Sequence, residues 1–237
     1  MSLFNPTVAW ITLRGLLGRR RFLLLFPLPT LLLVLTVVTR DLTDAWATPV
    51  LHGLGLSVVL PLAALITGTS VLGSEIDDGT VVHVLAKPLP RREIVLSKFV
   101  VAFAVTVVTA AVPLAVAGAI GGGVRLAAGL LTGASVGAFA YCALFVALGI
   151  VTRRAVAAGL LYVLVWEGLL GNLLTGTHVL SVQQYALTIA DRIAASDALT
   201  ARLSLGVAAA MSGVLAVAGL ACAIDRLKAF SLTGETG

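Results

Sequence analysis

The sequence predicts an all-α membrane protein with six transmembrane helices. Hydrophobic residues make up 59% of its 237 positions and charged residues only 11%, against roughly 25% charged residues in an average soluble domain. A helix needs about 20 apolar residues to cross a bilayer core, and backbone groups in lipid must bond within their own segment. Six apolar runs have the required length: 22–39, 50–73, 94–118, 126–151, 156–174 and 203–224.

The basic residues orient these six helices, because cytoplasmic loops carry an excess of lysine and arginine. Twelve of the 16 lysines and arginines fall on one side, so we expect both termini in the cytoplasm of a bacterial cell and a multi-pass protein of its plasma membrane. The net charge of +5 favours anionic lipid headgroups as partners. It does not indicate nucleic-acid binding, because the basic residues are spread along the membrane borders. The twelve are Arg14, Arg19, Arg20, Arg21, Lys87, Arg91, Arg92, Lys98, Arg153, Arg154, Arg226 and Lys228.

The first 21 residues predict a helix along the cytoplasmic membrane interface. Asn5 followed by Pro6 is typical of a helix start. The residues that follow mix large apolar side chains with arginines, as interfacial helices do; a frayed basic tail is the alternative. Arg19, Arg20 and Arg21 before an apolar run resemble a secretory signal, but the 18-residue run exceeds a usual signal core.

The fourth predicted span carries a stripe of small residues, with Gly129, Gly133 and Gly137 at intervals of four. Glycines on one helix face allow a second helix to approach closely. We expect this helix packing to occur within the subunit rather than between subunits.

The segment 175–202 is too polar to span the membrane and predicts a short extracellular helix before the last span. Ser181 and Gln184 form a capping-box pattern. Apolar residues at helical spacing then form one face, so we expect an amphipathic helix on the outer surface that could dip into the membrane. This face contains Val182, Tyr185, Ala186, Ile189 and Ile193.

The chain carries no motif for chemistry of its own. Its only lysines are Lys87, Lys98 and Lys228, and none lies in a G-x-x-x-x-G-K-[ST] phosphate loop. The histidines at 52, 83 and 178 have no metal-ligand spacing. The cysteines at 142 and 222 fall inside predicted spans and are expected to be buried small side chains rather than a disulfide. We therefore expect no enzyme activity, no metal and no cofactor bound by this chain.

Glu167 stands out because it lies well inside the fifth predicted span, after Trp166. A charge at that depth costs about 3 kcal/mol or more, so the carboxyl must pair, face a cavity or stay protonated. Two roles remain open: a residue on the substrate path that could carry a proton, or a structural residue that hydrogen-bonds to a neighbouring span.

The cytoplasmic loop after the second span carries the most specific pattern, GSEIDDGTVVHVLAKPLPRREIVLSK over residues 73–98. This loop resembles that of the permease subunits of type-2 ATP-binding-cassette (ABC-2 type) exporters. The family pattern has an acidic residue, a Gly-Thr pair, a short helix, a proline turn with arginine, and a lysine entering the third span. Here these places are held by Glu75, Gly79, Thr80, Pro88, Arg91 and Lys98.

The resemblance extends over the whole chain and implies an assembly of separate parts. A dimer of permease subunits would form the export path, and two ABC ATPase subunits would bind ATP and Mg beneath it. Residues 74–93 would be the coupling loop, with a coupling helix from about 78 to 86. Its acidic start suits the helix dipole. The substrate and the choice between homodimer and heterodimer stay open, as does a role in cofactor maturation. The resemblance assigns ATPase coupling to Glu75, Asp77, Asp78, Gly79, Thr80 and His83.

Two other functions compete with this one. An ion-coupled secondary transporter would use Glu167 as its proton site, although one intramembrane carboxyl is thin support. A non-transporting membrane scaffold would use the cytoplasmic loop as a docking platform. Co-purification with an ATPase separates both from an exporter.

Overall fold

The computed structural model describes residues 6–17, 23, 25–43, 46–77, 91–170, 179–195, 199, 201 and 203–232, and nearly all of them are helical; the exceptions are turns and short connections such as 40–43 and 152–154. No strand occurs among these residues. The all-α class that composition and apolar run length predict is therefore confirmed.

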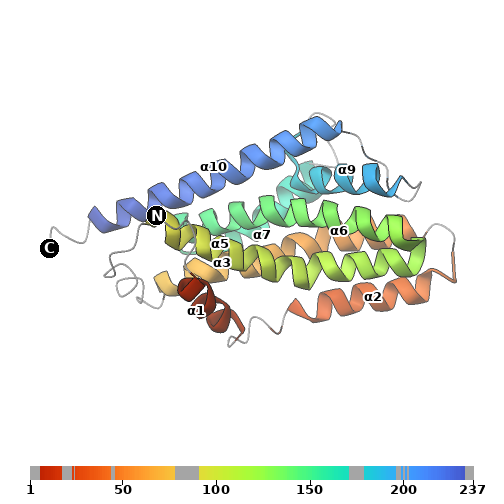
Figure 1. Cartoon of the computed structure of the whole chain (residues 1–237), viewed down its shortest axis with the longest axis horizontal. Helices are drawn as coiled ribbons and strands as arrows, with labels where there is room; N and C mark the ends of the chain where they lie inside the picture. Colours follow the sequence, from red (N-terminus) through yellow and green to blue (C-terminus); the bar gives the residue numbers. More distant parts are fainter. Residues whose placement is uncertain are drawn as a thin grey trace.

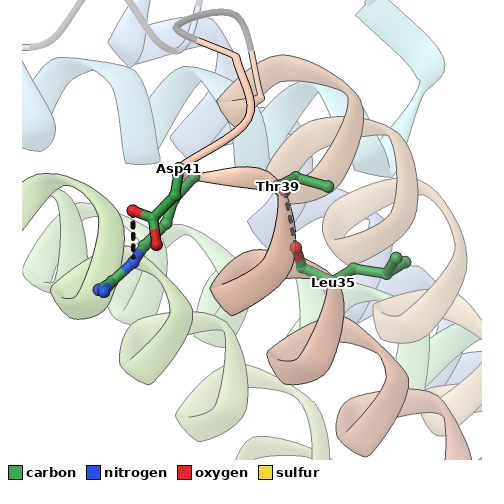
Figure 2. A network of polar contacts seen from close by, with 4 residues as sticks. Leu35, Thr39 and Asp41 are labelled. Atoms are coloured by element: carbon green, nitrogen blue, oxygen red, sulfur yellow. Dashed lines mark hydrogen bonds and ion pairs between the residues drawn. The ribbon is translucent and has the colours of Figure 1, made fainter.

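The first two helices are short. Helix α1 (Pro6–Leu17) begins at the proline that the sequence marks as a helix start. Helix α2 (Pro27–Thr39) corresponds to the first predicted span, but its described part begins at Pro27. At its end, the Thr39 hydroxyl donates to the Leu35 carbonyl at 2.7 Å, and Arg40 forms an exposed ion pair with Asp41 at 3.2 Å (Figure 2).

The second predicted span consists of two continuous segments. It begins as a wide π-helix, η2 (Thr48–Val59), and continues as α3 (Leu60–Asp77). Helices of π type are rare and collect at functional sites. The wider turn has a consequence for side chains: residues five apart, which lie on different faces of an ordinary helix with 3.6 residues per turn, share a face here.

The third and fourth predicted spans form a helical hairpin without a loop. Helix α5 (Arg91–Thr106) continues through η3 (Val107–Ala111) into α6 (Val112–Val151). Within α6, Gly123 has φ 80° and ψ −171°, a conformation that L side chains rarely adopt, and the chain reverses there. The two arms then pack closely, because a Cβ at Gly118 would lie 2.7 Å from Leu130 Cδ1.

The remaining elements are α7 (Ala155–Leu161), which runs into the π-helix η4 (Tyr162–Leu170), then α9 (Val182–Ala194) and α10 (Leu205–Leu232). By length and hydropathy, three helical stretches among the described residues can cross a membrane: Thr48–Val71, Arg91–Val151 and Leu205–Leu227. The second of these is the hairpin. Two apolar helices are shorter, Pro27–Thr39 and Ala155–Leu169.

Helix α6 lies at the centre of the bundle. It packs against α2, α3, α9 and α10, and the two arms of the hairpin run side by side along the long axis of the molecule (Figure 1). Helix α1 and the carboxyl end of α10 lie at the same end of the bundle (Figure 1). The aromatic rings of Tyr141 and Phe145 stack in the core with centroids 5.8 Å apart.

Helix α9 differs from the amphipathic surface helix that the apolar face suggests. Every residue from Ser181 to Ala190 is buried, on all sides of the helix, whereas Ile193 of the predicted apolar face is exposed. The reason is packing: α9 lies in the bundle against α6 and α10. Cys222 also differs from expectation, since it is exposed on α10, while Cys142 is fully buried.

Candidate functional site

The glycine stripe of α6 forms the surface against which α9 packs. A Cβ placed on Gly129 would lie 2.5 Å from the Ala190 carbonyl oxygen, and one on Gly133 would lie 2.3 Å from that of Ala186. A Cβ on Gly137 would lie 2.9 Å from the Ala186 Cβ. Helix α9 therefore runs antiparallel to α6, and its first turn lies deeper in the bundle than its last. The close approach occurs inside one subunit.

Glu167 binds the start of α9. Its carboxylate lies in η4, is only 3% exposed, and accepts hydrogen bonds from three groups. The Val182 N–H and the Tyr162 hydroxyl donate to Oε1 at 2.9 Å and 3.2 Å, and the Ser181 hydroxyl donates to Oε2. Ser181 is also the N-cap of α9, where its oxygen accepts from the Gln184 N–H at 3.3 Å. The carboxylate thus sits at the positive end of the α9 dipole.

Two aromatic residues fix the short segment that precedes α9. The Trp166 indole N–H donates to the Leu180 carbonyl at 3.2 Å, and the Tyr185 hydroxyl donates to the Val179 carbonyl. Burial, with a smaller contribution from the Glu167 charge, raises the pKa of Tyr185 to about 12. The Tyr185 hydroxyl therefore keeps its proton at neutral pH and remains a donor.

A second set of polar contacts joins α9 to η2. The Gln183 side-chain amide donates to the His52 ring nitrogen Nε2 at 2.8 Å and also to the Ser57 hydroxyl oxygen. Ser57 in turn donates to the His52 carbonyl at 2.9 Å. His52 and Ser57 are five residues apart, and the wide turn of η2 places both opposite one glutamine side chain.

Lys98 connects α3 and α5, the two helices on either side of residues 78–90. It is 1% exposed on α5, and its ammonium group donates to the Val71 carbonyl of α3 at 2.9 Å. A few turns away, the Thr67 and Thr106 hydroxyls bond at 2.7 Å, and Thr106 contacts the Cys142 sulfur at 3.3 Å. Such bonds between helices help to hold a membrane bundle together.

The proposed coupling residues are only partly visible. Glu75 and Asp77 lie in the last turns of α3. Asp78, Gly79, Thr80 and His83 lie outside the described residues. In the described part of the chain, no cluster of three or more His, Cys, Asp or Glu side chains could hold a metal ion.

A family model described as "ABC-2 family transporter protein" matches residues 38–190, from the end of α2 into the second half of α9. The chain belongs to this family. No curated protein sequence matches it. The resemblance to ABC-2 permeases read from the coupling-loop pattern is thereby confirmed, and the chain is a component of a membrane transporter. The match includes both sets of contacts made by α9 and the Lys98 contact.

Sequence reasoning missed His52, Ser57 and Gln183 in this ABC-2 protein. In an ordinary helix with 3.6 residues per turn, positions five apart lie on different faces, so helical spacing alone gives no reason to pair His52 with Ser57. The same holds for Tyr162 and Glu167, which are also five apart and bond to one another within η4. A proline near the start of η2, Pro49, marks only where that segment begins.

Proposed function

We propose that the chain is the permease subunit of an ABC exporter in a bacterial plasma membrane. Two permease subunits form the substrate path, and two separate ATPase subunits bind ATP and Mg and drive it. The family match over residues 38–190 carries this proposal, because ABC-2 permeases generally work with ABC ATPases. The absence of a phosphate loop from the sequence supports the separation of permease and ATPase.

The Lys98 contact supports coupling through the loop at 74–93. A buried ammonium group bonded to a carbonyl of the neighbouring helix holds α3 and α5 together just before they enter this loop. Charged donors make stronger hydrogen bonds than neutral ones. A displacement of the loop would therefore move α3 and α5 together, which is what coupling between an ATPase and the transmembrane helices requires.

Six spans with both termini in the cytoplasm agree with the architecture. The hairpin supplies two spans, and α2, η2–α3, α7–η4 and α10 supply the other four. Short spans such as α2 can be accommodated by local thinning of the bilayer. Helix α1 and the carboxyl end of α10 lie at one end of the bundle, which supports an even number of spans (Figure 1).

The outer faces of α2 and α10 support a membrane-embedded dimer. Large apolar side chains are exposed there, and they suit lipid or a second permease copy. These side chains include Leu31, Val34, Val37 and Val38 on α2 and Val207, Val214 and Val217 on α10.

We expect Arg92 and Arg153 to face the cytoplasm, and Leu42 and Val124 to face the outside. Leu42 is 71% exposed and Val124 is 84% exposed, at the end of the bundle where the hairpin reverses. Single cysteines at these four positions, in a background without Cys142 and Cys222, can be treated with a membrane-impermeant thiol reagent applied to intact cells. Labelling at 42 and 124 alone is expected. Labelling at 92 and 153 alone would show that the topology is the reverse of the proposed one.

The permease alone should hydrolyse no ATP and should bind its ATPase through residues 74–92. Replacing Asp78, Thr80 and His83 together with alanine should weaken ATPase association by about tenfold or more, as expected when a central contact of an interface is removed. The measurement is co-purification, followed by titration of the ATPase onto the permease in nanodiscs. Replacing Thr43, on the other side of the membrane, is the control. Unchanged ATPase binding and unchanged transport in the triple variant would refute the assignment.

The contacts of Glu167 do not favour the ion-coupled alternative. All three groups that bond to its carboxylate belong to η4 or to the start of α9, and none is a second carboxyl group, an imidazole or an amine. A carrier of protons needs a partner that receives the proton. The carboxylate instead joins two elements of one subunit, which suits a structural role in the exporter.

A further inference from the structure

The first residues of α9 contact two different parts of the bundle. Ser181 and Val182 bond to Glu167 of η4, and Gln183 bonds to His52 and Ser57 of η2. Helix α9 therefore lies between the fifth and the second predicted spans, and its polar start touches both. Any motion that separates these two spans must break one of the two sets of contacts.

The contacts with η4 are the stronger set. One carboxylate accepts three hydrogen bonds, and two of the donors come from the first turn of α9. Separation here would remove two of the three hydrogen bonds of Glu167, which is 3% exposed, and leave it bonded only to Tyr162 of η4 among the described residues, and a buried group that loses partners is costly.

The contacts with η2 are the weaker set. They join neutral groups, and a single amide of Gln183 serves both His52 and Ser57. His52 and Ser57 are half-buried, so water can replace the glutamine when the contact is broken. The His52–Gln183–Ser57 contact can therefore open and close at lower cost than the Glu167 contact.

We propose that Gln183 is a positioning residue whose bonds to His52 and Ser57 form a releasable contact, and that Glu167 fixes α9 to η4 throughout the transport cycle. When the path opens to the outside, η2 separates from α9, while α9 and η4 move together. The inference rests on the proposed export function, because that function supplies the opening. The contacts themselves can be tested on the permease alone.

The first experiment measures hydrogen–deuterium exchange of the permease in nanodiscs. Gln183→Leu should raise exchange of the backbone amides of η2 about fivefold, since a released helix opens locally more often, and should leave η4 unchanged. Gln184→Leu is the matched control: Gln184 is the adjacent glutamine, 8% exposed against 7% for Gln183. Its side-chain oxygen has no hydrogen-bond partner in the described part of the chain, so this variant should leave both segments unchanged.

A second variant, in η2, distinguishes loss of the contact from a local folding defect caused by the change at Gln183. His52→Ala should raise exchange in η2 as Gln183→Leu does, and the double variant should add little, because both remove one interaction. The proposed contact would be overturned if exchange in η2 of either single variant equalled that of the wild type. It would also be overturned if the effects of the two changes were additive in the double variant.

The second experiment measures release in the complex with the partner ATPase, trapped with Mg-ATP and vanadate. Exchange in η2 should rise above the resting level, while α9 and η4 stay protected. A rise in η4 with η2 unchanged would show that the bundle separates on the other side and would overturn the proposal. If no ATPase associates, the proposed function fails, and the first experiment still decides the Gln183 contact.

Discussion

Gly133→Val is expected to displace α9 from α6 and to cause a large loss of stability. Even the first added carbon would lie 2.3 Å from the Ala186 carbonyl oxygen and 2.8 Å from the Ala190 Cβ. Both obstacles belong to the backbone or to a Cβ, so neither can turn away. Overpacking of this kind costs about 1–3 kcal/mol and occasionally more. We expect a cost at the upper end, because residues 182–190 of α9 are buried.

The measurement is the apparent midpoint of thermal unfolding of the detergent-solubilised protein, with Gly133→Ala as an intermediate step in the series. Gly213→Val on α10 is the control, because no atom lies within 4 Å of a Cβ built at Gly213. The control should unfold close to the wild-type midpoint. Equal midpoints for Gly133→Val and Gly213→Val would show that α9 does not pack against this stripe.

Composition and apolar run length predicted the helical class because burial in lipid leaves the backbone few alternatives. The glycine stripe also predicted a close helix contact, since small residues allow it wherever the partner lies. The partner itself could not be predicted. Helix α9 has polar residues at Ser181, Gln183 and Gln184, and a polar helix start is normally read as exposed. Only the tertiary arrangement supplies the groups that satisfy Ser181 and Gln183 inside the bundle.

The contacts around η2 and η4 were hidden for a geometric reason. A sequence shows which residues are polar, but the number of residues per helical turn decides which of them lie on the same face of the helix. The pairs His52–Ser57 and Tyr162–Glu167 come together because these segments have a wide turn. The capping pattern was more informative, because it is local: Ser181 caps α9 as the spacing predicts. The Gln184 side-chain oxygen, however, has no partner among the described residues, so only half of the box forms.

Glu167→Ala is expected to cost about 3 kcal/mol in stability, the upper end of the range for leaving buried polar groups without partners. The change removes the acceptor of the Ser181 hydroxyl, the Val182 N–H and the Tyr162 hydroxyl at once. Helix α9 would lose the carboxylate that joins its first residues to η4, while the Trp166–Leu180 hydrogen bond and the packing of α9 against α6 would remain. The apparent unfolding midpoint should fall, and exchange should rise at the start of α9 and in η4.

Glu167→Gln should retain most of the stability and most of the transport, because the amide can reproduce the bonding pattern. Its oxygen can accept from Val182 and Tyr162, and its NH₂ group can donate to the Ser181 oxygen once that hydroxyl proton turns away. What is lost is the charge at the start of α9, worth about 0.3–1 kcal/mol at a helix terminus. The comparison of Ala with Gln therefore separates hydrogen bonding from charge. If Gln abolishes ATPase-driven transport while the complex stays assembled and its unfolding midpoint is unchanged, Glu167 works by ionising. A proton-coupled step would then have to be part of the mechanism, since no structural role distinguishes the two side chains to that extent.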